Sequence, residues 1–312
     1  MSNFWKNKAV AITGGNGFLG KYVRKKLEER NCKKISIIER KKYNLVDGKD
    51  VQKMYDDNKP DIVFHLAAVV GGIGVNQKNP GKFFYENAMI NLQVMHGAYL
   101  NKIDKIISIG TVSVYPKNTP LPFRENYIWE GFPEVTNAPY GIAKRILHVQ
   151  STSYKKQYGL NSILLVLTNL YGPGDNFNPD SSHVIAALIK RFFDAKKNNE
   201  KEVVIWGNGE STRDFSYVED IAEGIIQAAE KYNNTDPVNL ASGKEVSIKE
   251  LAMLIKKQIG YEGNIIWDKN KPSGPQRRFI DINKAKKEFG YKIITNLEEG
   301  IKKTIDWYIN KN

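Results

Sequence analysis

A tyrosine and a lysine that could together move a proton lie four residues apart in the run Pro139-Tyr140-Gly141-Ile142-Ala143-Lys144. On a helix, residues at this spacing share one face, so the Tyr140 phenol and the Lys144 ammonium would be neighbours. A positive charge there favours the phenolate, and we expect it to lower the pKa of Tyr140 toward neutrality. The hydroxyl of Thr111 could hold a substrate alcohol against that phenolate. These groups predict proton transfer at a carbinol while a cofactor takes the hydride.

The spacing by itself is a weak signal. The chain contains three Tyr-x-x-x-Lys pairs, which begin at Tyr22, Tyr55 and Tyr140. A chain this rich in both residues would hold about two such pairs by chance, and the simple interpretation of each is a solvated helix face. Only the third pair follows a strand that ends in hydroxyl residues, so its meaning depends on the elements that position it.

Predicted strands and helices alternate through the first half of the chain. Apolar strands are expected at residues 9–13, 35–38, 61–66, 105–109 and 162–166, and the longest helices at 80–100 and 140–158. This order predicts an α/β fold with a Rossmann-type, doubly wound parallel sheet, which binds ligands at the carboxyl ends of its strands. Glu39, Ala67, Thr111 and Asn169 all lie at or just beyond such an end.

The pattern changes after Tyr171, where a loop rich in glycine, proline and asparagine begins. We expect residues 1–172 and about 213–240 to form a dinucleotide-binding domain. Residues 173–212 and about 241–312 are expected to form a smaller C-terminal substrate-binding domain.

The first predicted strand runs directly into a glycine-rich loop. Its glycines allow a tight turn and a close approach of the backbone to a pyrophosphate at the N-terminus of the next helix. Between a strand and a helix, this spacing predicts a dinucleotide cofactor bound by Gly14, Gly17, Phe18, Leu19 and Gly20. The simpler alternative is a tight turn that binds no ligand.

The end of the second predicted strand bears on the choice of dinucleotide. A carboxylate at Glu39 would accept hydrogen bonds from the adenosine ribose hydroxyls and repel a 2′-phosphate, which favours NAD. The adjacent Arg40 could bind that phosphate instead, so NADP stays open.

Composition limits the partners and the compartment. The net charge of +13 is dispersed, with no Lys/Arg block of five or more, so we expect no nucleic-acid partner. The chain has no apolar run long enough to cross a membrane, and its first strand leaves no room for a signal peptide. The single cysteine, Cys32, fits a reducing compartment. We therefore expect a cytoplasmic protein without membrane contact.

The histidines do not predict a metal site. The chain has four, and they show no metal-ligand spacing, so no metal is expected. His65 lies inside an apolar strand and is expected in the core.

Further segments carry a resemblance to a known family. They are residues 67–73, 136–140 and 168–177, followed closely by residues 182–185. Nearly end to end, the chain resembles the extended short-chain dehydrogenase/reductase family and, within it, the GDP-L-fucose synthases, which are epimerase-reductases. The glycine and Tyr-Lys motifs are shared by the wider family, whereas residues 67–73 and 182–185 point to this group.

The resemblance implies a role for each matching residue. Thr111, Tyr140 and Lys144 match the catalytic set: Tyr140 would exchange a proton with the sugar C4 oxygen, and Lys144 would hold the nicotinamide ribose. His183 matches a histidine that acts as an acid in epimerisation. The nucleotide diphosphate and base would be held by Asn169, Arg191, Trp206 and Arg213. A homodimer through the helices near residues 82–100 and 141–157 is also implied.

These residues also have simpler interpretations. Thr111 could be a strand-end hydroxyl, and His183 could cap the helix that starts near Val184. Trp206 could be a core residue, and Arg213 could form a surface ion pair with its neighbour Asp214.

The chain departs from the family at Ser113. The family has a cysteine there, two residues after the catalytic hydroxyl, and that cysteine is its base in epimerisation. A serine hydroxyl is a far poorer base, and Cys32 is expected at the wrong end of the second strand to replace it. Deprotonation beside the keto group is therefore in doubt, whereas hydride transfer is unaffected.

We therefore expect an NAD(P)-dependent oxidoreductase that acts at C4 of a GDP-linked hexose or heptose, as a dehydrogenase or a ketoreductase. The first alternative is a 3,5-epimerase/4-reductase of the GDP-L-fucose synthase type, which would use NADPH, His183 and another base. The second alternative is a nucleotide-binding protein that keeps the fold without turnover.

Overall fold

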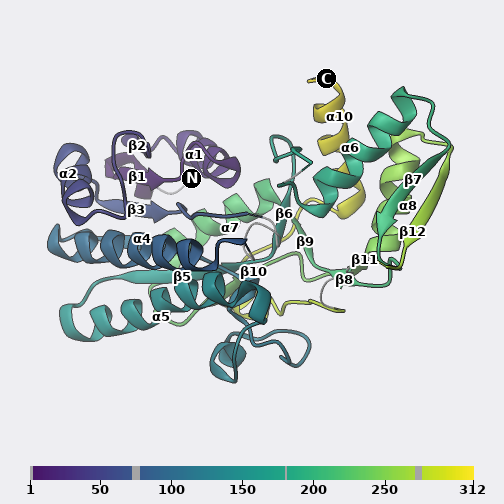
Figure 1. Cartoon of the computed structure of the whole chain (residues 1–312). Helices are drawn as coiled ribbons and strands as arrows, with labels where there is room; N and C mark the ends of the chain where they lie inside the picture. The colour runs from purple at the N-terminus through teal and green to yellow at the C-terminus, as the bar shows by residue number, and fades with distance from the viewer. Residues whose placement is uncertain (1–2, 72–77, 180, 271–275) are drawn as a thin grey trace.

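A parallel six-stranded sheet lies at the centre of the computed structural model, which describes residues 3–71, 78–179, 181–270 and 276–312 (Figure 1). Its strands follow the order β10 (Val238–Leu240), β5 (Ser162–Leu167), β4 (Lys105–Thr111), β3 (Ile62–His65), β1 (Ala9–Thr13) and β2 (Lys34–Ile38), and every pairing is parallel. The predicted doubly wound α/β fold is confirmed. Because the chain reverses its direction of winding beside β1, the expected ligand-binding end lies where β1 and β3 finish.

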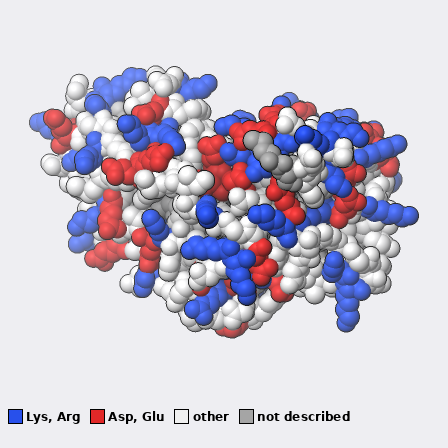
Figure 2. Space-filling view, turned by 180° about the vertical axis from the view of Figure 1, so that it is seen from behind, with Lys and Arg blue, Asp and Glu red and all other residues white. Residues whose placement is uncertain are grey.

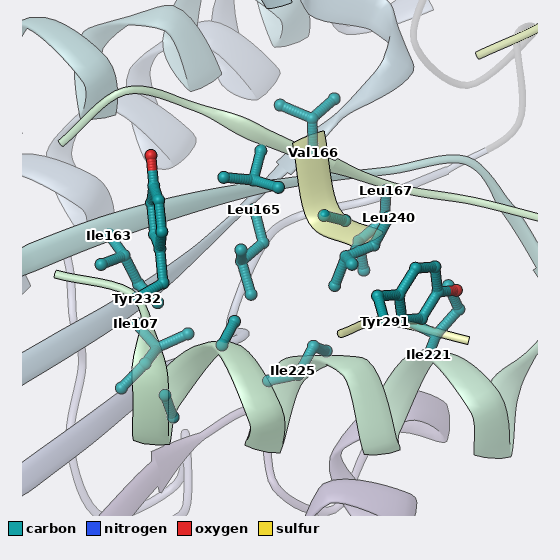
Figure 3. Close-up of a cluster of buried hydrophobic side chains, with 14 of the residues drawn as sticks. Ile107, Ile163, Leu165, Val166, Leu167, Ile221, Ile225, Tyr232, Leu240 and Tyr291 are labelled. Atoms are coloured by element: carbon teal, nitrogen blue, oxygen red, sulfur yellow. The ribbon is translucent and has the colours of Figure 1, made fainter. Parts of the chain in front are cut away.

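Helices cover both faces of the sheet, because its strands point alternate side chains into two buried layers. Val10 and Ile12 of β1 lie in one hydrophobic cluster, whereas Ala11 lies in another. The first layer holds α1 (Phe18–Glu29), α7 (Val218–Lys231) and α9 (Asn283–Phe289), and the second holds α2 (Gly48–Asn58), α4 (Pro80–Leu100) and α5 (Ala138–Tyr158). Figure 3 shows Ile221 and Ile225 of α7 beside the side chains of β5.

A second group of elements surrounds a hydrophobic cluster of its own, to the right of the sheet in Figure 1. It contains α6 (Val184–Lys197), α8 (Ile248–Ile259) and α10 (Leu297–Ile309), with β7 (Glu202–Trp206) paired to β12 (Asn264–Asp268). Shorter pairs are β6 (Asn169–Tyr171) with β9 (Phe215–Tyr217) and β8 (Thr212–Arg213) with β11 (Val246–Ser247). Ile280 and Phe289 pack with the sheet instead. The exact division into two domains stays a prediction.

Local sequence sets the ends of the elements that carry the candidate site. α5 begins at Ala138 rather than at the predicted Tyr140, because a proline such as Pro139 is tolerated in the first turn. It ends at Tyr158, and the C-cap residue Gly159 has a left-handed φ of 74°. β4 leads directly into a 3₁₀ turn, η2 (Val112–Val114); the other such turns are η1 (Asn3–Asn7), η3 (Glu125–Trp129) and η4 (Val135–Asn137).

Charged side chains are dispersed over the surface. Figure 2 shows Lys and Arg interspersed with Asp and Glu over one face of the molecule. Some are paired, as in the Arg24–Glu28 and Lys26–Glu219 salt bridges of 2.7 and 3.0 Å. The positive net charge therefore forms no continuous basic surface on that face. Among the residues described, no helix is long and apolar enough to cross a membrane.

The packing of α2 against α4 depends on Gly97. A Cβ atom at this position would lie 2.5 Å from the ring of the buried Tyr55, so Gly97→Ala should push the two helices apart. Overpacking of this kind costs about 1–3 kcal/mol. The matched control is Gly81→Ala in the same helix, where a Cβ meets nothing within 4 Å; alanine there should be neutral or stabilising. Urea unfolding of both variants measures the difference, and equal stabilities would contradict the prediction.

Candidate active site

The glycine-rich loop between β1 and α1 has the close approaches that a dinucleotide cradle needs. Gly14 has a φ of +73°, and a Cβ there would lie 2.9 Å from the amide nitrogen of Ala67. A Cβ at Gly20 would lie 2.3 Å from the Gly14 carbonyl oxygen. Gly17 occupies the N-cap of α1 without a side-chain cap, so the first-turn amides can meet an anion. Phe18 and Leu19 form that first turn, and the loop fits the pyrophosphate of a dinucleotide.

Glu39 and Arg40 follow β2, at the edge formed by the carboxyl ends of the strands, and both are exposed. The Arg40 side chain is 81% exposed and lies 3.8 Å from the carboxylate of Glu86 on α4. Neither side chain is buried in other contacts, so each is available to an adenosine ribose at this end of β2.

Tyr140 and Lys144 lie one turn apart on α5, with the Lys144 Nζ atom 6.0 Å from the centroid of the Tyr140 ring. The lysine side chain is only 2% exposed. Burial lowers the pKa of Lys144 to about 8, and burial raises the pKa of Tyr140 to about 12. The expectation that Lys144 brings Tyr140 toward neutrality is therefore wrong for the chain by itself, because the loss of solvation outweighs the lysine's attraction.

Thr111 and Ser113 are held close to the start of α5. The Ser113 amide donates to Thr111 Oγ1 at 3.3 Å, which leaves the threonine hydroxyl proton available to another acceptor. A Cβ at Gly141 would lie 2.3 Å from the Ser113 carbonyl oxygen, so the η2 turn packs directly on the helix one residue beyond Tyr140. Arg145 Nε donates to the carbonyl of Val114 at 2.8 Å and fixes the same turn. Thr111 is thus both a strand-end hydroxyl and a neighbour of the Tyr140 turn.

Cys32 lies far from this turn, as predicted. It follows α1, and its thiol donates to the carbonyl of Lys8, just before β1. This is the amino end of the sheet, opposite the end at which Thr111 lies. Cys32 therefore cannot replace a base at position 113.

The other two Tyr-x-x-x-Lys pairs have structural roles. Tyr22 donates its hydroxyl to the Pro173 carbonyl, and Lys26 forms a salt bridge with Glu219. Tyr55 is fully buried and donates to the Val94 carbonyl, while Lys59 is the left-handed C-cap of α2. These contacts distinguish them from the pair on α5.

Asn169 lies beside the backbone that directly follows Arg213, because β6 and β9 pair in parallel. The Asn169 side chain donates to the Asp214 carbonyl at 3.3 Å. Asp214 does not pair with its neighbour: it is fully buried and accepts from the amides of Ser242 and Gly243. The alternative of a surface Arg213–Asp214 ion pair is therefore not what the structure contains.

Arg213 has a second arginine near it, which sequence reasoning missed. Burial lowers the pKa of Arg213 to about 10, and the positive charge of Arg278 lowers it further. Burial also lowers the pKa of Arg278. Neither guanidinium forms a salt bridge within the part of the chain that the structure describes. Two half-buried cations of this kind suit a diphosphate. The only signal in the sequence was the Arg277-Arg278 pair, of which Arg277 instead bonds Glu245.

The remaining predicted residues are exposed. His183 is the N-cap residue of α6, but its side chain makes no capping hydrogen bond, so the capping alternative does not account for it. Trp206 is 55% exposed at the end of β7 and is not a core residue. Arg191 donates to the Val204 carbonyl at 3.1 Å and lies on α6, beside the same strand. The contacts of His183, Trp206 and Arg191 do not by themselves indicate a ligand.

Comparison with known proteins decides the family. The model of the NAD dependent epimerase/dehydratase family matches residues 10–241. The chain belongs to this family. It is 36% identical over 304 residues to GDP-L-fucose synthase 1 of Arabidopsis thaliana, covering 97% of this chain and 94% of that one. It is thus an NAD(P)-dependent oxidoreductase of the extended short-chain dehydrogenase/reductase type.

Solved structures of similar proteins agree with this assignment. A GDP-6-OMe-4-keto-L-xylo-heptose reductase from C. jejuni superimposes with a TM-score of 0.92 at 29% identity, covering 98% of this chain and 99% of that one. MlghC, a GDP-mannoheptose C4 reductase from Campylobacter jejuni with NADP bound, gives 0.88 at 30% identity, covering 97% and 99%. Among this chain's described residues, no group of three His, Cys, Asp or Glu side chains could hold a metal ion.

The buried ammonium of Lys144 makes stability depend on pH. Its pKa is about 8 in the folded chain and 10.5 for an ordinary lysine, so the folded state binds this proton less tightly. Below pH 8 the charge is present in both states and its burial costs up to about 3 kcal/mol. As the pH rises from about 8 to 10.5, Lys144 loses its proton in the folded state before it does so in the unfolded state, and the cost of burying the charge disappears.

Lys144→Met should therefore raise the free energy of unfolding of the cofactor-free protein near pH 7, and much less near pH 10. Methionine keeps the length of the side chain and removes the charge. Urea unfolding at the two pH values measures the effect. An equal gain at both, or a loss at pH 7, would contradict it.

Proposed function

We propose that this protein reduces a 4-keto group of a GDP-linked sugar, by hydride transfer from NAD(P)H with Tyr140 as the proton donor. The observation that carries the proposal is the partly buried phenol of Tyr140 on α5, which lies next to the turn of Thr111 and Ser113 and whose pKa is raised to about 12 by the loss of solvation. A phenol that keeps its proton at neutral pH suits donation to a carbonyl oxygen, which is the direction of reduction. Oxidation of the C4 alcohol is the reverse reaction at the same residues.

The roles of the residues follow from their positions. The Thr111 hydroxyl, already an acceptor from Ser113, donates to the C4 oxygen, and Tyr140 supplies the proton to it. Lys144 would hold the nicotinamide ribose. A nicotinamide dinucleotide whose pyrophosphate is held by the glycine loop would supply the hydride. The packing of the η2 turn on Gly141 fixes the position of Thr111 relative to the start of α5.

The substrate class rests on the relatives and on the two arginines. The proteins reported above are named for GDP-linked hexoses and heptoses. Arg213 and Arg278 carry two positive charges with burial-lowered pKa values, and a nucleoside diphosphate would neutralise both. Asn169 and Arg191 would contact the nucleotide, and Trp206 would stack on its base.

Ser113 limits the reaction to C4. A serine hydroxyl in place of a thiol provides no base for the carbons on either side of the keto group, and Cys32 lies at the other end of the sheet. The epimerase-reductase alternative would need His183 together with another base. We propose reduction without epimerisation.

The assembly and the compartment are also proposals. We propose a homodimer through the outer faces of α4 and α5, where Phe84, Tyr85 and Val149 are exposed at 42%, 58% and 54%. The dispersed charge and the single cysteine favour the cytoplasm.

Turnover in heavy water tests the function. With a GDP-4-keto-6-deoxyhexose and reduced cofactor in D₂O, the product should contain no deuterium at C3 or C5 beyond that in an enzyme-free control. Tyr140→Phe should lower kcat about 10²–10⁴-fold and leave the cofactor Kd unchanged. Deuterium at C3 or C5 that depends on the enzyme would establish the epimerase alternative. Absence of turnover with any GDP-4-keto sugar would leave only the nucleotide-binding alternative.

The cofactor preference depends on Glu39 in our proposal. Glu39→Ala removes the charge that would repel a 2′-phosphate, so the ratio of kcat/KM for NADPH to that for NADH should rise about tenfold. Arg40→Ala, at the neighbouring exposed position, is the matched variant and should lower the ratio. Steady-state kinetics with both cofactors measures it. A ratio that does not respond to Glu39→Ala would remove Glu39 from cofactor selection.

A further inference from the structure

A chain of hydrogen bonds crosses the buried layer between the glycine loop and α5. The Ala67 amide donates to Thr13 Oγ1 at 3.2 Å, and Thr13 Oγ1 lies 2.9 Å from His65 Nδ1. His65 Nε2 lies 3.0 Å from Asn91 Oδ1, and Asn91 Nδ2 donates to the carbonyl of Ala143 at 2.8 Å. Thr13 and His65 are 0% exposed and Asn91 is 1% exposed. The chain therefore joins β1, β3, α4 and α5 without solvent.

The direction of each hydrogen bond follows from the two ends. The Ala143 carbonyl can only accept, so the Asn91 amide nitrogen faces it and the Asn91 oxygen faces the histidine. His65 Nε2 must then carry a proton, and Nδ1 accepts the hydroxyl proton of Thr13. Thr13 still has a lone pair for the Ala67 amide. With a neutral His65, each of these four contacts joins one donor to one acceptor.

The charge state of His65 agrees with that direction. Burial lowers its pKa to about 3, and the positive charge of Lys144 lowers it further. The histidine is thus close enough to Lys144 for their charges to interact, yet it stays neutral at every pH where the protein would work.

Lys144 needs an external restraint on its position. Among the described residues, no salt bridge or hydrogen bond holds its ammonium, although the side chain is 2% exposed. Its place beside the cofactor therefore depends on where α5 lies. Asn91 bonds the carbonyl of the residue directly before it, whereas Gln150 Nε2 makes a similar bond to the Leu92 carbonyl farther along α5.

We propose that His65 and Asn91 are positioning residues, which tie the Lys144 turn of α5 to the strand ends that form the cofactor cradle. The same β1 and β3 ends carry Gly14 and Ala67, which are so close that a Cβ at Gly14 would lie 2.9 Å from the Ala67 amide nitrogen. The ends of β1 and β3 would thereby position both a dinucleotide on the glycine loop and the ammonium of Lys144. The inference rests on the proposed role of Lys144 at the nicotinamide ribose.

The test separates the two halves of the cofactor. Asn91→Leu keeps the approximate volume and removes the bond to Ala143. It should weaken binding of intact NADPH about tenfold, since displacement by an ångström or less is costly at such a contact. Binding of adenosine 2′,5′-bisphosphate, which lacks the nicotinamide ribose, should stay unchanged. If the parent protein prefers NADH, the two ligands to compare are NADH and AMP. With sugar substrate, kcat should fall at least tenfold at constant KM for the sugar.

The matched control is Gln150→Leu, which removes the other side-chain amide tie between α4 and α5. It should change neither cofactor affinity. Thr13→Val breaks the chain at its far end without touching α5, and should weaken NADPH binding in the same direction if Asn91→Leu does not fold. Titration by protein fluorescence measures all of these.

Two outcomes overturn different statements. If Lys144→Met leaves the NADPH affinity unchanged, the proposed contact of Lys144 with the nicotinamide ribose is wrong. The positioning inference is wrong if Lys144→Met weakens NADPH binding but Asn91→Leu and Thr13→Val do not. It is also wrong if these two variants weaken the binding of NADPH and of adenosine 2′,5′-bisphosphate equally. Neither outcome affects the proposed function.

Discussion

The burial of the Lys144 ammonium is the constraint on which the candidate site depends. Removing a charge from water without an opposite charge is unfavourable, and the lowered pKa of Lys144 reflects that cost. The chain tolerates it because α5 packs along both α4 and the central sheet, so that the helix cannot rotate to bring the side chain back to solvent. The same packing fixes Tyr140 one turn earlier and raises its pKa. The position of α5 thus determines the pKa values of both Tyr140 and Lys144.

Two close backbone approaches bring the strand ends of the candidate site against helices. Gly20 lets α1 begin against the Gly14 carbonyl, and Gly141 lets α5 begin against the Ser113 carbonyl. In each case a strand end meets the first turn of a helix with no side chain between them. A doubly wound sheet brings these junctions to one edge, because all its strands run in the same direction. The glycine loop and the Thr111 hydroxyl, for which we propose a catalytic role, therefore lie at the same end of the sheet.

The main elements were predictable from the sequence, whereas their contacts were not. The helices α4 and α5 were located within two residues of their ends, and each begins with a proline in its first turn. The strands β8 and β11 have two residues each and pair with each other, so no local pattern could predict them. His65 was correctly expected in the core. Its bonds to Thr13 and Asn91 join residues far apart in the chain and could not be inferred from the sequence.

The electrostatic prediction failed for a specific reason. Spacing on a helix predicts which charges are neighbours, but it does not predict how much water they lose, and for Tyr140 the loss of water is the larger effect. The candidate residues on β6, β8 and α6 could be named from a family resemblance only, because their side chains meet through the fold rather than along the chain. Arg278 was missed for the same reason: it approaches Arg213 from a distant segment.

Three cations of the candidate site differ from the dispersed surface charges in Figure 2, because they are partly or fully removed from water. Lys144, Arg213 and Arg278 all have pKa values lowered by burial, so each is less stable as a cation here than in water. An anionic dinucleotide and a nucleoside diphosphate would supply the missing counter-charges. Ligand binding to the folded state alone then stabilises it by mass action. A site that is electrostatically unfavourable when empty would thus become favourable when both proposed ligands are bound, which links the stability of the fold to its proposed chemistry.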